Sequence, residues 1–140
     1  QPRTFSFETF SDTFLTLAAA APLLPCPVTI SGIGHTRFQE TDRIAAMTEG
    51  LAAAGAGVET ARDSLVIRPF RKGPRPDGPP VVINTYKDHR VAMSFAVLGS
   101  RNRFGDGRPW LALADPLCCG KTFPGFFAEL DNLYRNCHDK

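Results

Sequence analysis

The chain has 140 residues, the size of one ordinary globular domain, and 43% of them are hydrophobic, which is enough to build a core. Charged residues make up 21% and the formal net charge is only +2, so the composition does not indicate a nucleic-acid-binding protein. The longest apolar run, at 14–24, is interrupted by Thr16 and Pro22 and is shorter than the roughly 18 residues of a membrane span, so we expect a cytoplasmic protein without a membrane segment.

The apolar pattern predicts helices and strands in alternation. Ile44, Met47 and Leu51 recur at helical spacing and Gly55 follows them, which is typical of a helix and its end. The proline- and glycine-rich segment 71–80 predicts an exposed loop. In chain order we expect a helix at 12–24, a strand at 28–33, a helix at 41–54, strands at 58–60, 64–68 and 81–84, a helix at 88–102, a strand at 110–114 and a last helix that opens at Thr122 and Pro124. This order predicts a mixed α/β fold with βα units.

Cations lie at or just before the starts of three predicted helices, at Arg43, Arg90 and Lys121. The helix macrodipole is positive at this end, so each placement costs a few tenths to about 1 kcal/mol. Because each cation follows a predicted strand of one domain, we expect the three to form a common site at the carboxyl ends of the strands, where α/β proteins usually bind ligands. A bound anion would relieve the repulsion between these cations and the helix dipoles. The sequence therefore predicts a site for an anionic small molecule.

The same loops carry acidic side chains, which are Asp12, Glu40, Asp42 and Asp88. Carboxylates at helix starts are common as N-caps and dipole partners, so each of them alone is more often structural than catalytic. Asp42 with Arg43, and Asp88 with Arg90, can equally be local ion pairs. Taken from the residues alone, the combination predicts an anion site with candidate acid and base groups.

Other classes of site have weaker support. No Gly-x-Ser-x-Gly nucleophile motif is present, and the glycines at 55 and 57 follow a predicted helix instead of opening one, which excludes a phosphate loop there. His35, His89 and His138 lack metal-ligand spacing. The cysteines form neither a zinc nor a disulfide pattern, so we expect free thiols at Cys26, Cys118, Cys119 and Cys137.

Three motifs occur in order within about residues 8–134: Gln39-Glu-Thr-Asp-Arg43 before a helix, Lys87-Asp-His-Arg-Val-Ala-Met93, and Asp115-Pro with Lys121-Thr-Phe-Pro124. Together they resemble the 5-enolpyruvylshikimate-3-phosphate (EPSP) synthases, the enolpyruvyl transferases of the shikimate pathway of aromatic amino-acid biosynthesis. This resemblance implies an α/β fold that is part of a two-domain inverse α/β barrel built of βαβαββ units. Residues 1–140 would form the carboxyl-terminal part of one domain, and an amino-terminal portion, as a separate chain, would be the partner.

The resemblance also implies a reaction, transfer of the enolpyruvyl group of phosphoenolpyruvate to the 5-hydroxyl of shikimate 3-phosphate with release of phosphate, without a metal or cofactor. Asp12 would act as a base at the acceptor hydroxyl. Either Glu40 or Lys121 would protonate the methylene carbon, and both would be catalytic. The positions implied to bind substrates are His35, Gln39, Arg43, His89, Arg90 and Lys121.

The chain departs from the family pattern at two positions that contact the acceptor in family members. Gln39 stands where a lysine is common and His35 where an asparagine is common, so shikimate 3-phosphate should bind more weakly unless His35 or Arg37 compensates. Two alternatives stay open: a homologue that binds anions without turnover, and the UDP-N-acetylglucosamine enolpyruvyl transferases. The latter share the fold but lack the paired Asp-His-Arg and Lys-Thr-Phe-Pro motifs.

Overall fold

The computed structural model describes the backbone of residues 1–138 and the side chains of residues 1–120 and 122–137. The strands are β1 (Arg3–Ser6), β2 (Val28–Ser31), β3 (Val58–Thr60), β4 (Ser64–Ile67), β5 (Val81–Ile83) and β6 (Leu111–Leu113). The α-helices are α1 (Phe14–Ala20), α2 (Arg43–Ala53), α3 (His89–Gly99) and α4 (Phe126–His138). Short 3-10 helices are η1 (Ser11–Thr13), η2 (Ala21–Leu23), η3 (Gly34–Phe38) and η4 (Pro116–Lys121). Within the described part of the chain, no helix combines the length and apolar character needed to cross a membrane.

Most of the predicted elements are confirmed, and the differences have local causes. The strand β1 was not predicted, because its four residues are all exposed and show no apolar alternation. The predicted helix at 12–24 is α-helical only in its middle, since Pro22 has no N–H to continue the ladder and lies in η2. The last helix does not open at Thr122: the Thr122 N–H bonds to the Cys119 carbonyl and ends η4, and α4 begins at Phe126.

The strands form two sheets that repeat one connection scheme. In the first sheet the order is β1-β2-β4-β3, with β1 and β2 parallel and β4 antiparallel to both of its neighbours. The elements β1, α1, β2, α2, β3 and β4 therefore form one βαβαββ unit. The second sheet pairs β5 and β6 in parallel, so β5, α3, β6 and α4 repeat the first four elements of that unit. Mixed α/β architecture is thus confirmed.

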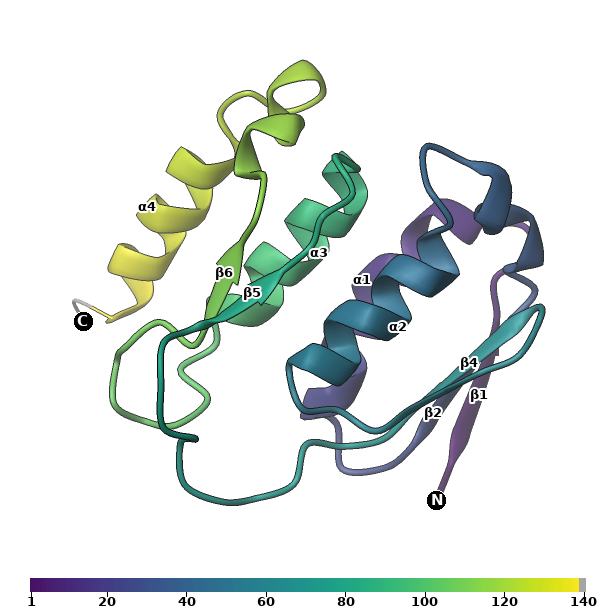
Figure 1. Ribbon diagram of the computed structural model, residues 1–140, viewed down its shortest axis with the longest axis horizontal. Coiled ribbons are helices and arrows are strands. Elements are labelled where there is room, and N and C mark those ends of the chain that lie inside the picture. Colours follow the sequence, from purple (N-terminus) through teal and green to yellow (C-terminus); the bar gives the residue numbers. More distant parts are fainter. Residues whose placement is uncertain (139–140) are drawn as a thin grey trace.

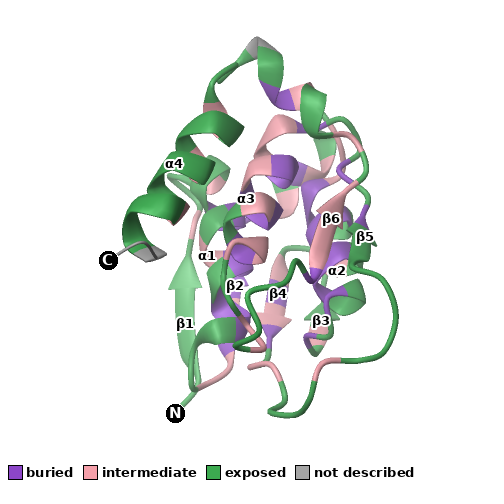
Figure 2. Cartoon of the chain, turned by 90° about the vertical axis from the view of Figure 1, so that its left-hand side faces the viewer, coloured by how far each residue is buried: buried purple, intermediate pink, exposed green. Residues whose placement is uncertain are grey.

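Helices α1, α2 and α3 lie inside, between the two sheets, whereas α4 lies at the periphery (Figure 1). Helices α1 and α2 cover one face of the first sheet, and α3 lies between them and the β5–β6 pair. Burial alternates along β2 and β4, so one face of each strand points to the helices. Figure 2 shows the buried residues gathered on these inner surfaces, whereas β1 and α4 are mostly exposed. The largest fully buried side chains include Phe14, Ile30, Ile44, Leu65 and Phe95.

Helices α2 and α3 approach closely at Gly50. A Cβ atom at this position would overlap the tip of the Phe95 ring, which is fully buried. A glycine inside a helix costs roughly 1 kcal/mol relative to alanine. Close contact between the helices explains why the sequence accepts that cost here. This contact fixes the spacing of α2 and α3, and with it the spacing of the polar residues at their amino termini.

The exposed segment 71–80 connects the two units and is attached at Arg75. All three nitrogens of this guanidinium donate hydrogen bonds. Nε and Nη2 donate to the Asp106 carboxylate at 2.6 Å each, and Nη1 donates to the Pro109 carbonyl at 3.1 Å. Arg75 holds the pKa of the Asp106 carboxyl well below its usual range. The connecting segment is therefore tied to the loop that precedes β6.

A second arginine joins the two units through aromatic rings. The Arg103 guanidinium lies over the rings of Phe70, Phe104 and Trp110, at 3.7, 4.8 and 4.9 Å from their centroids. It also donates from Nη1 to the Ala54 carbonyl at the end of α2, at 2.8 Å. Burial lowers the pKa of Arg103. This cluster binds the end of α2 to the loop before β6, at the opposite end of the helices from the polar site described next.

Candidate functional site

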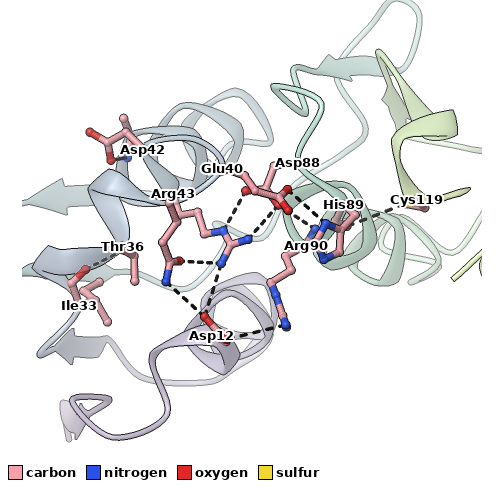
Figure 3. A network of polar contacts seen from close by, with 12 residues as sticks. Asp12, Ile33, Thr36, Glu40, Asp42, Arg43, Asp88, His89, Arg90 and Cys119 are labelled. Atoms are coloured by element: carbon pink, nitrogen blue, oxygen red, sulfur yellow. Dashed lines mark hydrogen bonds and ion pairs between the residues drawn. The ribbon is translucent and has the colours of Figure 1, made fainter. Parts of the chain in front are cut away.

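Most of the residues that the sequence singled out lie together where the amino termini of α1, α2 and α3 converge (Figure 3). They come from η1, from the loop before α2 and from the start of α3. The residues that join this network are Asp12, Gln39, Glu40, Arg43, Asp88, His89 and Arg90. His35 is exposed on η3 and joins none of these contacts, and the side chain of Lys121 lies outside the described residues.

Arg43 is the centre of the network. Its side chain is only 4% exposed, and Nε and Nη2 donate to the two carboxylate oxygens of Asp88 at 2.8 and 3.4 Å. Nη1 donates to the Gln39 amide oxygen at 2.6 Å and lies 3.5 Å from Asp12. The protein's own carboxylates thus balance the cation that opens α2. Because all three of its nitrogens have partners, the guanidinium is held in place and can orient the groups around it.

Asp88 joins the starts of two helices. It is fully buried, it caps α3 by accepting the Arg90 backbone N–H at 2.9 Å, and it pairs with Arg43 at the first position of α2. The sequence suggested Arg90 as its ionic partner, but the side-chain pair that forms crosses 45 positions of the chain. Asp42, for its part, caps α2 through the Ala45 N–H and pairs with Arg37, not with Arg43. The two acids therefore build the scaffold of the site.

Asp12 lies on the open side of the network. Its side chain is 53% exposed and accepts a hydrogen bond from the Gln39 amide at 3.4 Å. The guanidinium of Arg90 lies 3.8 Å away and that of Arg43 lies 3.5 Å away. A carboxylate at this point faces two cations and solvent, which suits it to accept a proton from a bound hydroxyl.

Glu40 and His89 form the second acid–base pair. His89 Nδ1 lies 3.2 Å from the Glu40 carboxylate, and the imidazole is 14% exposed whereas Glu40 is 52% exposed. Such a pair can exchange a proton with a bound molecule and share the resulting charge. One donor atom each from Glu40, Asp88 and His89 lies within 4.8 Å of the others, a spacing that a metal ion could use. The Asp88 oxygens already bind a guanidinium, however, which disfavours a second cation beside them.

A cavity of about 580 Å³ opens beside this pair. It is lined by Glu40, Tyr86, Lys87, His89, Asp115, Leu117, Cys118 and Thr122. Acids, a lysine and a histidine converge there beside apolar groups such as Leu117, a mixture that suits a small polar ligand. The sequence pattern did not mark Tyr86, Lys87 or Cys118 as residues of the site. Lys87 lies within a quoted motif, but nothing in the sequence indicates that it faces a cavity.

Cys119 lies on η4 and contacts the start of α3. Its thiol lies 3.8 Å from the His89 carbonyl and its side chain is buried (Figure 3). Burial and the neighbouring Cys118 raise the pKa of the Cys119 thiol to about 11. Cys26, Cys118, Cys119 and Cys137 are all free, as the sequence predicts. Cys119 is therefore a structural thiol that positions η4 against the start of α3.

A second, apolar cavity of about 310 Å³ lies between α1 and α3. Leu15 and Ala19 of α1 and Met93 and Val97 of α3 line it, and Asp12 stands at its polar end. Val97 is 52% exposed, which is unusual for a valine in a helix that otherwise faces a core. Helix α4 likewise exposes two large apolar residues, Phe127 and Leu133.

Comparison with known proteins gives a consistent result. The family model of EPSP synthase (3-phosphoshikimate 1-carboxyvinyltransferase) matches residues 1–130. A 3-phosphoshikimate 1-carboxyvinyltransferase from Opitutus terrae is 53% identical over 130 residues, which cover 91% of this chain and 28% of that protein. One from Nostoc punctiforme is 44% identical over 121 residues, 85% of this chain and 25% of that protein. The solved structure of EPSP synthase from Acinetobacter baumannii matches with a TM-score of 0.67 and 26% identity, over 89% of this chain and 27% of that one. The chain thus spans about 28% of the length of the first of these relatives.

Proposed function

Because this chain belongs to the EPSP synthase family, we propose that it supplies one wall of an active site that transfers the enolpyruvyl group of phosphoenolpyruvate to the 5-hydroxyl of shikimate 3-phosphate. The relatives are several times longer than this chain, so the activity is proposed for the protein that contains it together with an amino-terminal portion. Residues 1–140 would be the carboxyl-terminal part of one of two domains. The convergence of three acidic and three basic side chains at the starts of α1, α2 and α3 is the observation that carries this proposal.

The reaction needs a proton added at one place and another removed elsewhere. In the proposed sequence the acceptor hydroxyl attacks the second carbon of phosphoenolpyruvate, and its proton passes to a base while the methylene carbon gains a proton. Loss of a proton from the resulting methyl group then expels phosphate and restores the double bond. Asp12 is suited to the hydroxyl, since its carboxylate faces solvent between two guanidinium groups. Glu40, paired with His89, is suited to the carbon.

The cations would hold the anionic groups of phosphoenolpyruvate. Arg90 is 39% exposed and contacts only a partly exposed carboxylate, so its guanidinium can turn to a ligand. Arg43 is buried and would act from behind, by orienting Gln39 and Asp12. Lys121 keeps its proposed role on the strength of the motif it belongs to. Positioning and charge neutralisation of this kind lower a barrier without a metal.

The acceptor would lie on the side of Asp12 and Gln39. The Gln39 amide bridges Asp12 and Arg43 and provides no positive charge of its own. We therefore expect shikimate 3-phosphate to bind more weakly here than to a lysine-containing relative, with His35 as the exposed group nearest along the chain able to compensate. Replacing Gln39 by lysine should lower KM for shikimate 3-phosphate without a matching change in KM for phosphoenolpyruvate.

The partner of this chain would be the amino-terminal portion of the same protein, docked on the apolar cavity between α1 and α3. These helices are the equivalent elements of the two repeated units, and apolar residues of both line the same groove, where Val97 of α3 is 52% exposed. Exposed apolar surface of this kind is costly in a free chain and marks a contact surface. The polar Asp12 at the end of the groove would bring the partner's residues next to the acid–base groups.

Phosphate release from shikimate 3-phosphate and phosphoenolpyruvate tests the proposal. The chain is combined with the amino-terminal portion, or with the corresponding remainder of the Opitutus terrae relative. Asp12→Asn and Glu40→Gln should each lower kcat by about a hundredfold or more, because each removes a proton-transfer group. Glu59→Gln, on an exposed carboxylate of β3 that pairs with Arg68, is the matched control and should leave kcat unchanged.

Deuterium uptake from solvent into the methylene group separates the two acids. Glu40→Gln should abolish the uptake, whereas Asp12→Asn should reduce turnover by acting on the acceptor. Undiminished uptake in Glu40→Gln would show that Glu40 does not protonate the methylene carbon, and would assign that role to Lys121. A stable complex that binds phosphoenolpyruvate without turnover would support the alternative hypothesis, in which the protein binds anions but does not catalyse the reaction.

A further inference from the structure

Lys87 is a cation in the site cavity that has no partner within the described residues. It lines the cavity with Glu40, His89 and Asp115, yet none of the ion pairs or hydrogen bonds of the described side chains includes its ammonium group. The neighbouring cations differ, since Arg43 pairs with Asp88 and Arg90 lies near Asp12. An unpaired ammonium at the wall of a polar cavity is free to bind an anion without first breaking an internal contact.

The backbone around Lys87 is held in an unfavourable conformation. Tyr86 and Lys87 have φ values of 53° and 55°, in the left-handed region, and neither is a glycine. A side chain with a Cβ atom is strained in this region, and two such residues in succession are rare. Strained residues of this kind persist where surrounding contacts fix them, and they concentrate at functional sites.

The surrounding contacts do fix this turn. The Tyr86 N–H bonds to the Asn84 side-chain oxygen at 2.9 Å, and the Asp88 N–H bonds to the Thr85 carbonyl at 2.9 Å. The Tyr86 hydroxyl donates to the Glu49 carboxylate on α2. These contacts hold the turn just before α3 at which Lys87 lines the cavity. A glycine at this position would satisfy the backbone but would not supply a charge.

We propose that Lys87 is a specificity-determining residue whose ammonium binds an anionic oxygen of phosphoenolpyruvate in the cavity beside Glu40 and His89. This inference rests on the proposed function. A lysine is a mobile point charge with three donors, which suits it to follow a phosphate or carboxylate from the free to the bound position. The strained turn places Lys87 at the wall of the cavity, where its side chain stays exposed to an incoming ligand.

Four variants of the assembled protein separate charge from backbone strain. Lys87→Gln removes the charge and keeps the strain, and Lys87→Arg keeps both. Lys87→Gly removes both, and Lys72→Gln, on an exposed lysine of the connecting loop, is the control. We expect Lys87→Gln and Lys87→Gly to raise KM for phosphoenolpyruvate about tenfold or more, because each loses a charge-assisted hydrogen bond. Lys87→Arg and the control should stay close to wild type.

The melting temperature supplies an independent measure. Lys87→Gly should raise it by about 2 °C while weakening phosphoenolpyruvate binding, since glycine relieves the left-handed strain. Lys87→Gln should not raise it. The KM effect should also shrink at high salt, where the ammonium is screened.

The outcomes distinguish this inference from the function on which it rests. If wild-type protein turns over and Lys87→Gln has an unchanged KM, Lys87 has no role in substrate binding and the inference fails alone. If wild type does not turn over, the proposed function fails, and the rise in melting temperature on adding phosphoenolpyruvate decides about Lys87. An equal rise in wild type and Lys87→Gln then overturns the inference, and a smaller rise in Lys87→Gln supports it.

Discussion

The buried pair of Arg43 and Asp88 should be energetically coupled, and its removal should loosen the starts of two helices at once. Asp88→Ala removes both oxygens that bind the Arg43 guanidinium, whose side chain is only 4% exposed. Breaking a buried pair in this way costs about 3–5 kcal/mol. Asp12, 3.5 Å from the same guanidinium but 53% exposed, offsets a part of that, while loss of the α3 cap adds about 1 kcal/mol. We therefore expect a total of about 4 kcal/mol for Asp88→Ala.

Asp88→Asn divides this total into its two contributions. Asparagine still caps a helix and still offers one oxygen to Arg43, but its NH2 group replaces the other acceptor and the charge is lost, so the cost should be about 2 kcal/mol. Combined with Arg43→Met in a double-mutant cycle, it should give a coupling energy of about 2 kcal/mol. The exposed pair Arg68 and Glu59, whose 2.9 Å contact is close in length to the 2.8 Å contact of the buried pair, is the control, and we expect it to give a coupling energy below about 0.5 kcal/mol.

Hydrogen exchange of peptides from α2 and α3 in the assembled protein gives the free energy of local opening for each variant. Both helices should lose protection together in Asp88→Ala, because one carboxylate serves both. The reasoning is refuted if the Arg43–Asp88 coupling is no larger than that of the control pair, or if only α3 loses protection. The second result would mean that Asp88 acts as a cap alone.

Three further perturbations test the fold. Gly50→Ala should lower the melting temperature despite the better helix propensity of alanine, because its Cβ would meet the buried Phe95 ring, and a net gain in stability would show that the ring can move. Asp106→Asn should destabilise at pH 7, and the difference from wild type should narrow as the pH falls below about 4, since Arg75 depresses the Asp106 pKa and that stability is present above the ordinary carboxyl pKa; a pH-independent difference would contradict it. Cys119, whose thiol pKa is raised to about 11, should resist iodoacetamide at pH 8 until urea unfolds the protein, as peptide mass spectrometry would show.

Helices α2 and α3 were predictable because their apolar positions recur at helical spacing and an acidic cap immediately precedes each of them. Asp42 and Asp88 both cap as expected for acids at helix starts. The strand β1 was not predictable in this way, since its register is set by pairing with β2 and none of its residues is buried. The start of α4 was misplaced because the Thr122 N–H completes η4 before the helix can begin.

The composition of the site was largely predictable and its connections were not. The chain does bring Arg43, Arg90 and Asp12 together at the starts of three helices. The pairing of Arg43 with Asp88 depends on how α2 and α3 pack, which no local pattern contains. The strain at Lys87 is likewise a property of the folded turn, because any residue type can precede a cap in the sequence.

The connecting segment 71–80 has a consequence for how the two units stay together. Its four prolines restrict the conformations that the segment can adopt, and Arg75, near its middle, attaches it to Asp106. Its covalent link keeps each unit at an effective concentration of about millimolar around the other. Extra residues inserted in this loop would lower the effective concentration of one unit around the other only slowly, because each doubling of loop length costs about 0.6 kcal/mol. Cleavage there would remove the tether altogether, and the units would then stay joined only while the Arg103 cluster and the helix contacts hold them at the protein's own concentration.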